Sequence, residues 1–390
     1  MAKRAFAAFI LLLGSPAVAQ IGGNGVDGVF HPSSNVVLDT TARPGGWDFS
    51  SVTIPAGVTV QLIGTNPAIL RSIGPVQIDG HLSADALAPV GTVGGAPGAG
   101  GFAGGDVGSP GAGPAGGVVG SYSPFASSPG GPGGHATPGR QSWAGGSTGV
   151  YGDDWVFDLR GGSGEGASVW PLSWGYPWGA PGGGGGGVVV VLSDSAIQLG
   201  GRVSARGHQF GAAGGIFLRA LGAVALGPGA TIDAAGFVHP FTGRAAGDGF
   251  VRLDGYGGKP VIDPSATIAP FPLNLSLPAI RHAGPMQVGT TYTVAGATLP
   301  GDGVWFLVSA GTVSIPLPPL GILELDPSLT LVLGMAVANN LAPDPQATLS
   351  LAIPNDPGLV GLPLWLQAIN ASTLAAAGPR LSNTLSTPIQ

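Results

Sequence analysis

The sequence contains no cysteine, and only 9% of its residues are charged. The absence of cysteine excludes disulfides, thiolate metal ligands and thiol nucleophiles. Basic side chains are especially scarce, with 14 Lys and Arg against 20 Asp and Glu and a net charge of −6. This balance leaves no basic patch, so nucleic acid and anionic lipid surfaces are not expected partners. Stability must come from packing and backbone pairing.

Long hydrophobic runs are also missing. The apolar run at residues 5–13 is about nine residues long, too short to cross a bilayer as a helix. It follows two basic residues at 3–4 and precedes the small residues 17–19, which suit signal peptidase. Pro, Gly or a charge interrupts each later apolar run. We expect a signal peptide at 1–19 and a secreted protein, extracellular or on the cell surface, that does not span a membrane.

Glycine and proline are abundant instead, with 73 Gly and 37 Pro among 390 residues. In a helix interior they cost about 1 and 3 kcal/mol respectively, so long helices are not expected. Hydrophobic residues still reach 44%, enough apolar surface for a core. The composition therefore predicts an all-β protein with glycine-rich loops.

The glycines concentrate at residues 91–187, where Gly95, Gly98, Gly101 and Gly104 lie three apart before the spacing slips. Slips in the register exclude a collagen triple helix. Two interpretations stay open. A period of three fits extended polyproline-type helices, whose glycine stripe lets neighbouring backbones approach closely. A flexible surface loop fits the same composition.

Short strands recur in the next segment. Units begin after glycine at Val188, Ile216 and Phe250, and the phrase at 76–84 resembles the ends of the first two units. A repeat of roughly 20–50 residues built from short strands indicates a solenoid. Three strands in each repeat favour a parallel β-helix over a propeller, which needs four in each blade.

We therefore predict a parallel β-helix domain at residues 20–258, with 91–187 as a glycine-rich insert. A Pro-rich linker is expected at 259–272. Residues 273–390 carry longer apolar runs separated by turn residues, a pattern typical of an antiparallel β-sandwich.

Several phrases resemble a known group of proteins. Residues 24–28 and 52–60, the glycine-rich insert and the repeated phrases are similar to secreted glycine-rich bacterial surface proteins. That resemblance implies a right-handed parallel β-helix of the pectate-lyase-like type. Residues 353–361 resemble a small C-terminal β-sandwich-like domain of exported bacterial proteins. The superfold serves lyases, hydrolases, adhesins and inert fibres, so fold alone does not choose a function.

Aromatic and acidic residues gather in the second half of the insert. Aromatic rings stack on sugars and carboxylates accept sugar hydroxyls, although the same rings also form the local core of a long loop. The candidate ligand-binding residues are Trp143, Tyr151, Asp153, Asp154, Trp155, Trp170, Trp174, Tyr176 and Trp178.

No cofactor or metal is predicted. Asp153, Asp154, Asp158 and Glu165 offer oxygen ligands of the kind Ca²⁺ prefers, but their spacing does not match a calcium loop. Solvated surface charges are the simpler interpretation.

The repeat region supplies four candidate catalytic residues, namely Arg219, Asp233, Arg252 and Asp254. At similar offsets in their repeats they could converge on adjacent coils, as a polysaccharide lyase or a hydrolase with paired carboxylates requires. The simpler interpretation is a set of outward-facing polar positions that protect the solenoid surface from aggregation.

These features favour an exported structural or adhesive surface or matrix protein without catalytic activity. The alternative is a carbohydrate-binding or polysaccharide-degrading protein, a lyase or a glycoside hydrolase. The expected partner is a polysaccharide or a cell-envelope surface, and self-association through the glycine-rich layer is a further hypothesis.

Overall fold

The computed structural model describes residues 21–123, 126–127, 129–140, 149–152, 159–170, 178–256, 258–339, 346–371 and 379–390. These residues form strands, turns and extended segments, with one short 3-10 helix at Pro357–Leu359. The expected all-β class is confirmed. The expected signal peptide at 1–19 lies outside the described residues.

The chain divides into two compact units. The coil unit comprises residues 22–254 and 260–274, and the C-terminal unit comprises residues 255–259 and 275–390, with Ile21 also grouped in it. Each is described by itself below.

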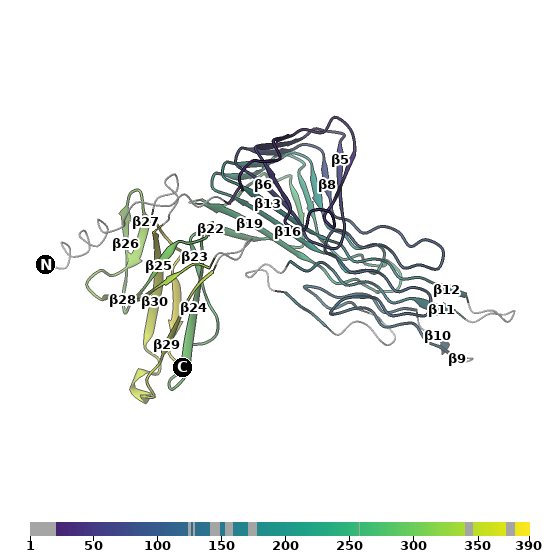
Figure 1. Cartoon of the computed structure of the whole chain (residues 1–390). Helices are drawn as coiled ribbons and strands as arrows, with labels where there is room; N and C mark the ends of the chain where they lie inside the picture. The colour runs from purple at the N-terminus through teal and green to yellow at the C-terminus, as the bar shows by residue number, and fades with distance from the viewer. Residues whose placement is uncertain are drawn as a thin grey trace. The chain divides into compact units, whose positions relative to one another are not determined.

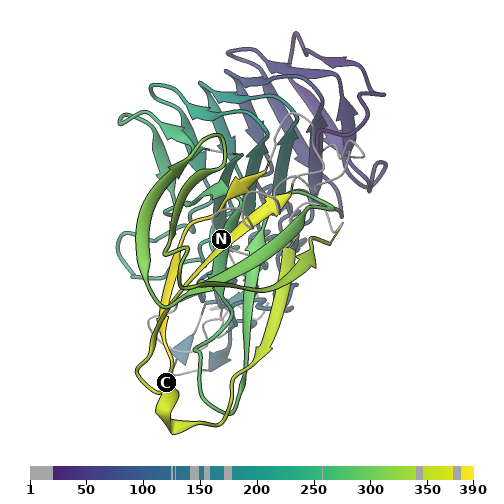
Figure 2. The same ribbon diagram turned by 90° about the vertical axis from the view of Figure 1, so that its left-hand side faces the viewer.

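The coil unit contains three parallel sheets of six strands, and the chain visits them in turn (Figures 1 and 2). This topology is compatible with a parallel β-helix. Sheet 1 holds β1 (Val29–Phe30), β4 (Ser51–Ile54), β7 (Val76–Ile78), β14 (Ile197–Leu199), β17 (Val224–Leu226) and β20 (Val261–Ile262). Sheet 2 holds β2 (Val36–Asp39), β5 (Thr59–Ile63), β8 (His81–Ser83), β15 (Arg202–Ser204), β18 (Thr231–Asp233) and β21 (Thr267–Ala269). Sheet 3 holds β3 (Trp47–Phe49), β6 (Ala68–Ser72), β13 (Val188–Ser193), β16 (Gly215–Ala220), β19 (Phe250–Tyr256) and β22 (Leu273–Leu277).

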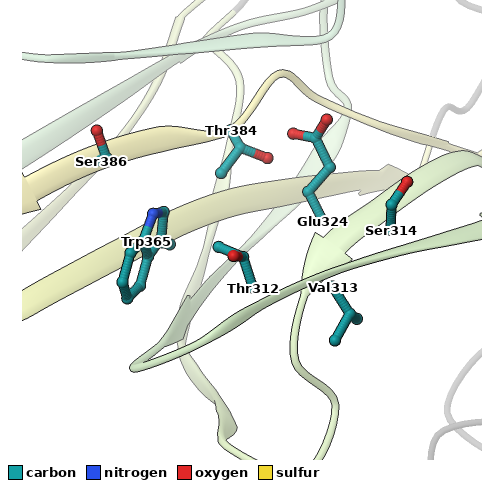
Figure 3. A pocket seen from close by; sticks show the side chains of 7 residues that line it. All are labelled: Thr312, Val313, Ser314, Glu324, Trp365, Thr384 and Ser386. Carbon is teal, nitrogen blue, oxygen red and sulfur yellow. The ribbon is translucent and has the colours of Figure 1, made fainter.

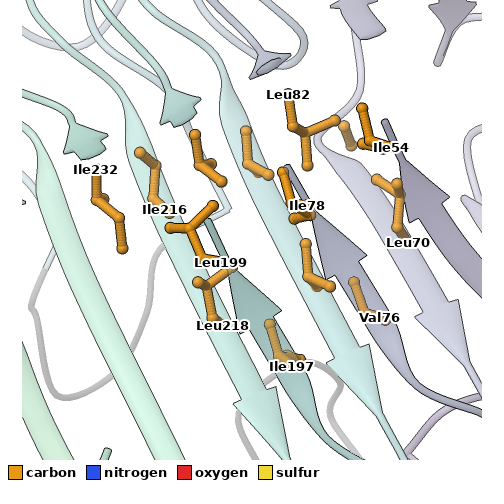
Figure 4. Packing of buried hydrophobic residues seen from close by; sticks show 14 of the residues in the cluster. Ile54, Leu70, Val76, Ile78, Leu82, Ile197, Leu199, Ile216, Leu218 and Ile232 are labelled. Carbon is orange, nitrogen blue, oxygen red and sulfur yellow. The ribbon is translucent and has the colours of Figure 1, made fainter. Parts of the chain in front are cut away.

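Period-two alternation turns every second side chain into the coil, where like residues stack from one coil to the next. Val52, Val76, Ile197 and Val224 form one such column through the strand register. All four are at most 2% exposed and belong to one apolar cluster (Figure 4). Full burial of each aliphatic side chain stabilises the fold by about 1.5–3 kcal/mol. The predicted stack of recurring apolar strands is confirmed.

The predicted linker at 259–272 is not a linker in the structure. Its β20 and β21 pair in parallel with β17 and β18 and continue sheets 1 and 2. The prolines avoid the ladder, because Pro264 lies in the turn between these strands and Pro270 directly follows β21. Proline is tolerated at such positions, so proline density alone was a poor sign of a linker.

The C-terminal unit is built from antiparallel sheets, an arrangement compatible with a β-sandwich. A three-stranded sheet, a five-stranded sheet in which β32 pairs with β30, and a two-stranded hairpin make up its described part. Its main core contains Tyr292, Val304, Phe306 and Leu366. The strands are β23 (Ala279–His282), β24 (Thr291–Ala297), β25 (Gly303–Ser309), β26 (Thr312–Leu317), β27 (Gly321–Leu325), β28 (Thr330–Val337), β29 (Gln346–Ala352), β30 (Pro363–Ala371), β31 (Arg380–Leu381) and β32 (Leu385–Pro388).

Candidate functional site

The insert between β8 and β13 contains the most unusual packing in the described chain. Extended segments run between sheet 3 and two short hairpins, β9/β10 (Tyr122–Ser123, Ala126–Ser127) and β11/β12 (Ser168–Trp170, Trp178–Ala180) (Figure 1). We call these segments, 94–105, 111–120, 130–135, 161–167 and 182–187, the glycine bundle. They cross-link through backbone hydrogen bonds without forming a sheet.

Segment 182–187 shows how the bundle is bonded. The carbonyls of Gly182, Gly183 and Gly184 accept from the amides of Gly95, Glu165 and His208, each at 2.9 Å. The next two carbonyls bond to the same two segments as the first two. The Gly185 carbonyl accepts from the Gly98 amide at 3.1 Å, and the Gly186 carbonyl accepts from the Gly162 amide at 2.8 Å. A pattern that repeats every third residue and points in three directions is that of a three-residue-per-turn extended helix.

Only glycine fits at the centre of the bundle. A Cβ on Gly185 would overlap the Gly162 carbonyl, and one on Gly183 would overlap the carbonyl of His208. A Cβ on Gly184 would lie 2.6 Å from the Ala96 oxygen. Because the obstacles are backbone atoms, no rotamer change relieves them. The six consecutive glycines at 182–187 are therefore the packed centre of the bundle.

This arrangement bears on the two interpretations of the glycine-rich region. The three-residue spacing at Gly95 and Gly98 places both amides against the carbonyls of Gly182 and Gly185. Both glycines lack room for a side chain. The hydrogen bonds and the close backbone approach of the described segments fit the polyproline-type interpretation.

The candidate ligand-binding residues of the insert lie partly inside and partly outside the described ranges. Trp143, Asp153, Asp154, Trp155, Trp174 and Tyr176 lie outside the described residues, as does Asp158. Trp170 and Trp178 are backbone partners in the β11/β12 hairpin. Tyr151 packs against the bundle, since its hydroxyl donates to the Gly161 carbonyl at 2.5 Å and its ring centroid lies 4.8 Å from that of His135.

Glu165 is a buried carboxylate within the bundle, not a solvated charge as the sequence suggested. One oxygen accepts from the Gly183 amide at 3.0 Å, and the other lies 3.3 Å from Nη2 of Arg244. The Arg244 guanidinium also donates to the Gly130 carbonyl at 2.6 Å and stacks 3.8 Å from the Phe210 ring centroid. Burial raises the pKa of Glu165, while the Gly183 amide and Arg244 oppose that rise. This ion pair joins the loop between β18 and β19 to the bundle.

Arg244→Met tests this connection. Methionine keeps apolar contact with Phe210, but it leaves Glu165 without its counter-charge and raises its pKa further. A folded-state pKa above the ordinary 4.5 means that stability is lost as pH rises through the folded value. We expect a loss of about 2 kcal/mol at pH 7 and a smaller loss at pH 5, measured by denaturant unfolding. Glu165→Gln in the same chain should remove the pH dependence, and an equal loss at both pH values would contradict the assignment.

Three of the four candidate catalytic residues come together in sheet 3. Arg219 Nη2 lies 2.6 Å from Asp254 Oδ2, and Arg252 Nε donates to Asp254 Oδ1 at 3.0 Å. Both guanidiniums lie over the Phe217 ring, 4.8 and 5.1 Å from its centroid. All three charged residues are at most 1% exposed. The expected outward-facing positions are therefore wrong for Arg219, Arg252 and Asp254, which form a buried ion cluster.

The fourth candidate, Asp233, lies in sheet 2 and belongs to a different charge group. Its Oδ2 accepts from Arg202 Nη2 at 2.9 Å and lies 3.6 Å from Arg206 Nε. Its side chain is 20% exposed, in keeping with a polar position on the coil surface. The structure thus separates Asp233 from Asp254 by placing them in different sheets with different partners.

Beside Asp233 lies a polar group that the sequence did not reveal. His81 Nε2 is 2.8 Å from the Ser204 hydroxyl, which donates to Asp85 at 2.8 Å. The order His–Ser–Asp differs from the Ser–His–Asp order of a hydrolase, and Ser204 is fully buried. Burial also lowers the pKa of His81. The one available signal was the repeat, since 81–83 and 202–204 are parallel partners separated by the whole insert.

A shallow groove of about 290 Å³ adjoins this group. Its polar lining consists of Thr59, Asp79, His81, Arg202 and Thr231, and the remainder is Val58 and glycines of the turns between sheets 1 and 2. The lining carries a carboxylate, a guanidinium, an imidazole and two hydroxyls. Such a set can hydrogen-bond a polar ligand such as a sugar.

Comparisons with known proteins do not identify the chain. No protein family matches it, and neither the curated proteins nor the solved structures contain a detectable relative. Within the described ranges, no group of three His, Asp or Glu side chains is placed to hold a metal ion. The described residues also include no helix with the length and apolarity needed to cross a membrane.

Proposed function

We propose that the chain is an exported structural or adhesive protein of a cell surface or extracellular matrix, and that it acts without catalysis. In this proposal residues 1–19 are a cleaved signal peptide, the coil unit is a right-handed parallel β-helix, and the C-terminal unit is a β-sandwich. The resemblance to secreted glycine-rich bacterial proteins supports export.

The glycine bundle carries this proposal. The glycines at its centre leave no room for a Cβ and bond their backbone groups to surrounding segments, which makes a stiff arm from a composition that would otherwise be flexible. The arm ends at the β9/β10 and β11/β12 hairpins. A rigid base that presents hairpin strands is the arrangement expected of an adhesive scaffold, since a pre-organised surface loses less entropy on binding.

The charged residues of sheet 3 support a structural role. Arg219, Arg252 and Asp254 are buried, and both guanidiniums are hydrogen-bonded to the one carboxylate, so these charged groups are used inside the fold. A lyase or hydrolase needs such groups in contact with solvent and substrate.

Two measurements test the proposal. Purified mature protein should bind cell-envelope preparations or insoluble polysaccharide in a pull-down assay. It should release no reducing ends and no unsaturated products from a broad polysaccharide panel. Turnover of any polysaccharide, sustained on repurification, would overturn the non-enzymatic claim.

The second candidate function is carbohydrate binding or polysaccharide cleavage by the coil unit. The groove containing Asp79, His81 and Arg202 favours it, together with the aromatic residues of the insert. Trp170→Ala, Trp174→Ala and Trp178→Ala should then abolish glycan-array binding, and binding that survives all three would sink the version that uses the insert. Self-association through the glycine-rich layer predicts oligomers whose size, measured by light scattering, grows with protein concentration. A protein that stays monomeric at all concentrations would count against self-association.

A further inference from the structure

The C-terminal unit carries a larger groove, of about 520 Å³. It lies between the β26/β27 hairpin and the paired strands β30 and β32. Its described lining contains one indole, one carboxylate, four hydroxyls and one aliphatic side chain, with no basic residue. These residues are Thr312, Val313, Ser314, Glu324, Trp365, Thr384 and Ser386 (Figure 3).

Trp365 is fixed as a platform at one side of the groove. Its half-buried ring packs against the apolar cluster of Leu307, Leu323 and Leu325. Ser386 lies directly opposite Trp365 on the neighbouring strand. Residues opposite each other in an antiparallel pair share a face of the sheet, so this register sets a hydroxyl beside the indole.

Glu324 is held on the facing element by a buried glutamine. The amide of Glu324 donates to Gln367 Oε1 at 3.1 Å. Gln367 Nε2 donates to the carbonyls of Ile322 and Ser382, at 2.8 and 3.0 Å, and Gln367 is 1% exposed. Gln367 thereby ties the hairpin to β30, while the side chain of Glu324 remains exposed at the groove (Figure 3).

Thr384 adds a second sign of a ligand. Its hydroxyl oxygen is buried, and within the described chain it makes no hydrogen bond. A buried polar atom without a partner costs about 1–3 kcal/mol, which a ligand hydroxyl in the groove can recover. Figure 3 places this residue between Ser386 and Glu324 above the indole.

We propose that this groove binds a neutral sugar chain. One pyranose ring stacks its C–H face on Trp365, and the Glu324 carboxylate accepts two of its hydroxyls. The four hydroxyl side chains bond the remaining sugar oxygens. The carboxylate, with no cation in the described lining, disfavours uronic acids and phosphorylated glycans. The volume lies within the usual range for small-ligand sites, about 300–1,000 Å³.

This site lies in the C-terminal unit and does not depend on the glycine bundle. If no sugar binds here, the proposed scaffold role is unaffected. If the protein does not adhere to cell envelopes, the proposal of sugar binding in this groove is likewise unaffected.

Titration calorimetry of the full mature chain tests the proposal. The probes are cello-, xylo-, malto- and chito-hexaose, with oligogalacturonate as the acidic counterpart. We expect at least one neutral oligosaccharide to bind and the acidic one to bind at least about tenfold more weakly, a difference of 1.4 kcal/mol. Trp365→Ala and Glu324→Gln should each weaken the neutral sugar by about tenfold or more.

Trp305→Phe is the matched control, because Trp305 is also a half-buried indole of the same sheet but does not line the groove. It should leave the affinity unchanged. If Trp365→Ala does not fold, Glu324→Gln decides, since it changes an exposed side chain. Absence of binding to every neutral probe at millimolar concentration would overturn the proposal. An affinity for the neutral sugar that is unchanged by Glu324→Gln would also overturn it. The same holds for an affinity that is lost only in the Trp170, Trp174 and Trp178 variants.

Discussion

Gly185→Ala is expected to destabilise the protein by about 4 kcal/mol. The added methyl group overlaps the Gly162 carbonyl, and the adjoining atom of Ser163 belongs to the backbone as well. Overpacking against rigid atoms costs about 1–3 kcal/mol or more, and each backbone hydrogen bond broken by the resulting shift costs about 1 kcal/mol. Gly185 takes part in two such hydrogen bonds. Its amide donates to the Phe102 carbonyl, and its carbonyl accepts from the Gly98 amide. Denaturant unfolding of the mature chain measures the loss.

Gly45→Ala is the control for this substitution. A Cβ at Gly45 meets open space, and no positive φ restricts the position. The change should be within about 0.5 kcal/mol of the parent protein, or slightly stabilising. If Gly185→Ala were equally harmless, the bundle would not be packed as described.

Asp254→Asn is the second substitution with a large expected effect. It removes the negative charge that Arg219 and Arg252 share, since both are buried and hydrogen-bonded to this carboxylate. Breaking a buried charge group by removing one partner typically costs about 3–5 kcal/mol, because uncompensated charge stays in the interior. The free energy of unfolding should fall by that amount.

Two comparisons sharpen this result. Asp233→Asn alters a partly exposed ion pair with Arg202, so its cost should be about 1 kcal/mol or less. Replacing Arg219, Arg252 and Asp254 together by Met, Met and Leu should recover much of the loss, since apolar residues of similar volume often replace buried ion groups without penalty. A single Asp254→Asn protein as stable as the parent would contradict a structural role for the cluster.

The coil could be predicted because its signal is local and repeated. Val76-Gln77-Ile78 and Ile197-Gln198-Leu199 alternate in the same phase, and the structure pairs them residue by residue. An inward column of β-branched and leucine side chains leaves little choice of register. The long insert between these strands changed the spacing but not the pattern.

The interior of the insert could be predicted only in part. A three-residue glycine spacing indicates a close approach of extended backbones, but not which backbones meet. Gly183, for example, is closed off by the carbonyl of His208, which belongs to the turn after β15. The uninterrupted glycines at 182–187 were the available sign that this segment is surrounded on all sides.

The sites were harder to predict than the fold. The same position in a strand suits an exposed arginine and a buried one. The sequence therefore favours the simpler surface position for Arg219 and Arg252, whereas the structure buries both. The group of His81, Ser204 and Asp85 is split by the insert, and the groove around Trp365 is assembled from β26, β27, β30 and their neighbours. Contacts between distant strands follow from the register, which no local pattern records.

The glycine bundle is a packed, hydrogen-bonded part of the fold. Hydrogen exchange of the amides in 182–188 measures this most directly. The amides of Gly182, Gly185, Gly186 and Val188 donate to backbone carbonyls at 2.7–2.8 Å, so they should exchange as slowly as the amides of β13 and β16. Exchange of the glycine segment at the rate of an unstructured peptide, with β13 still protected, would contradict the account.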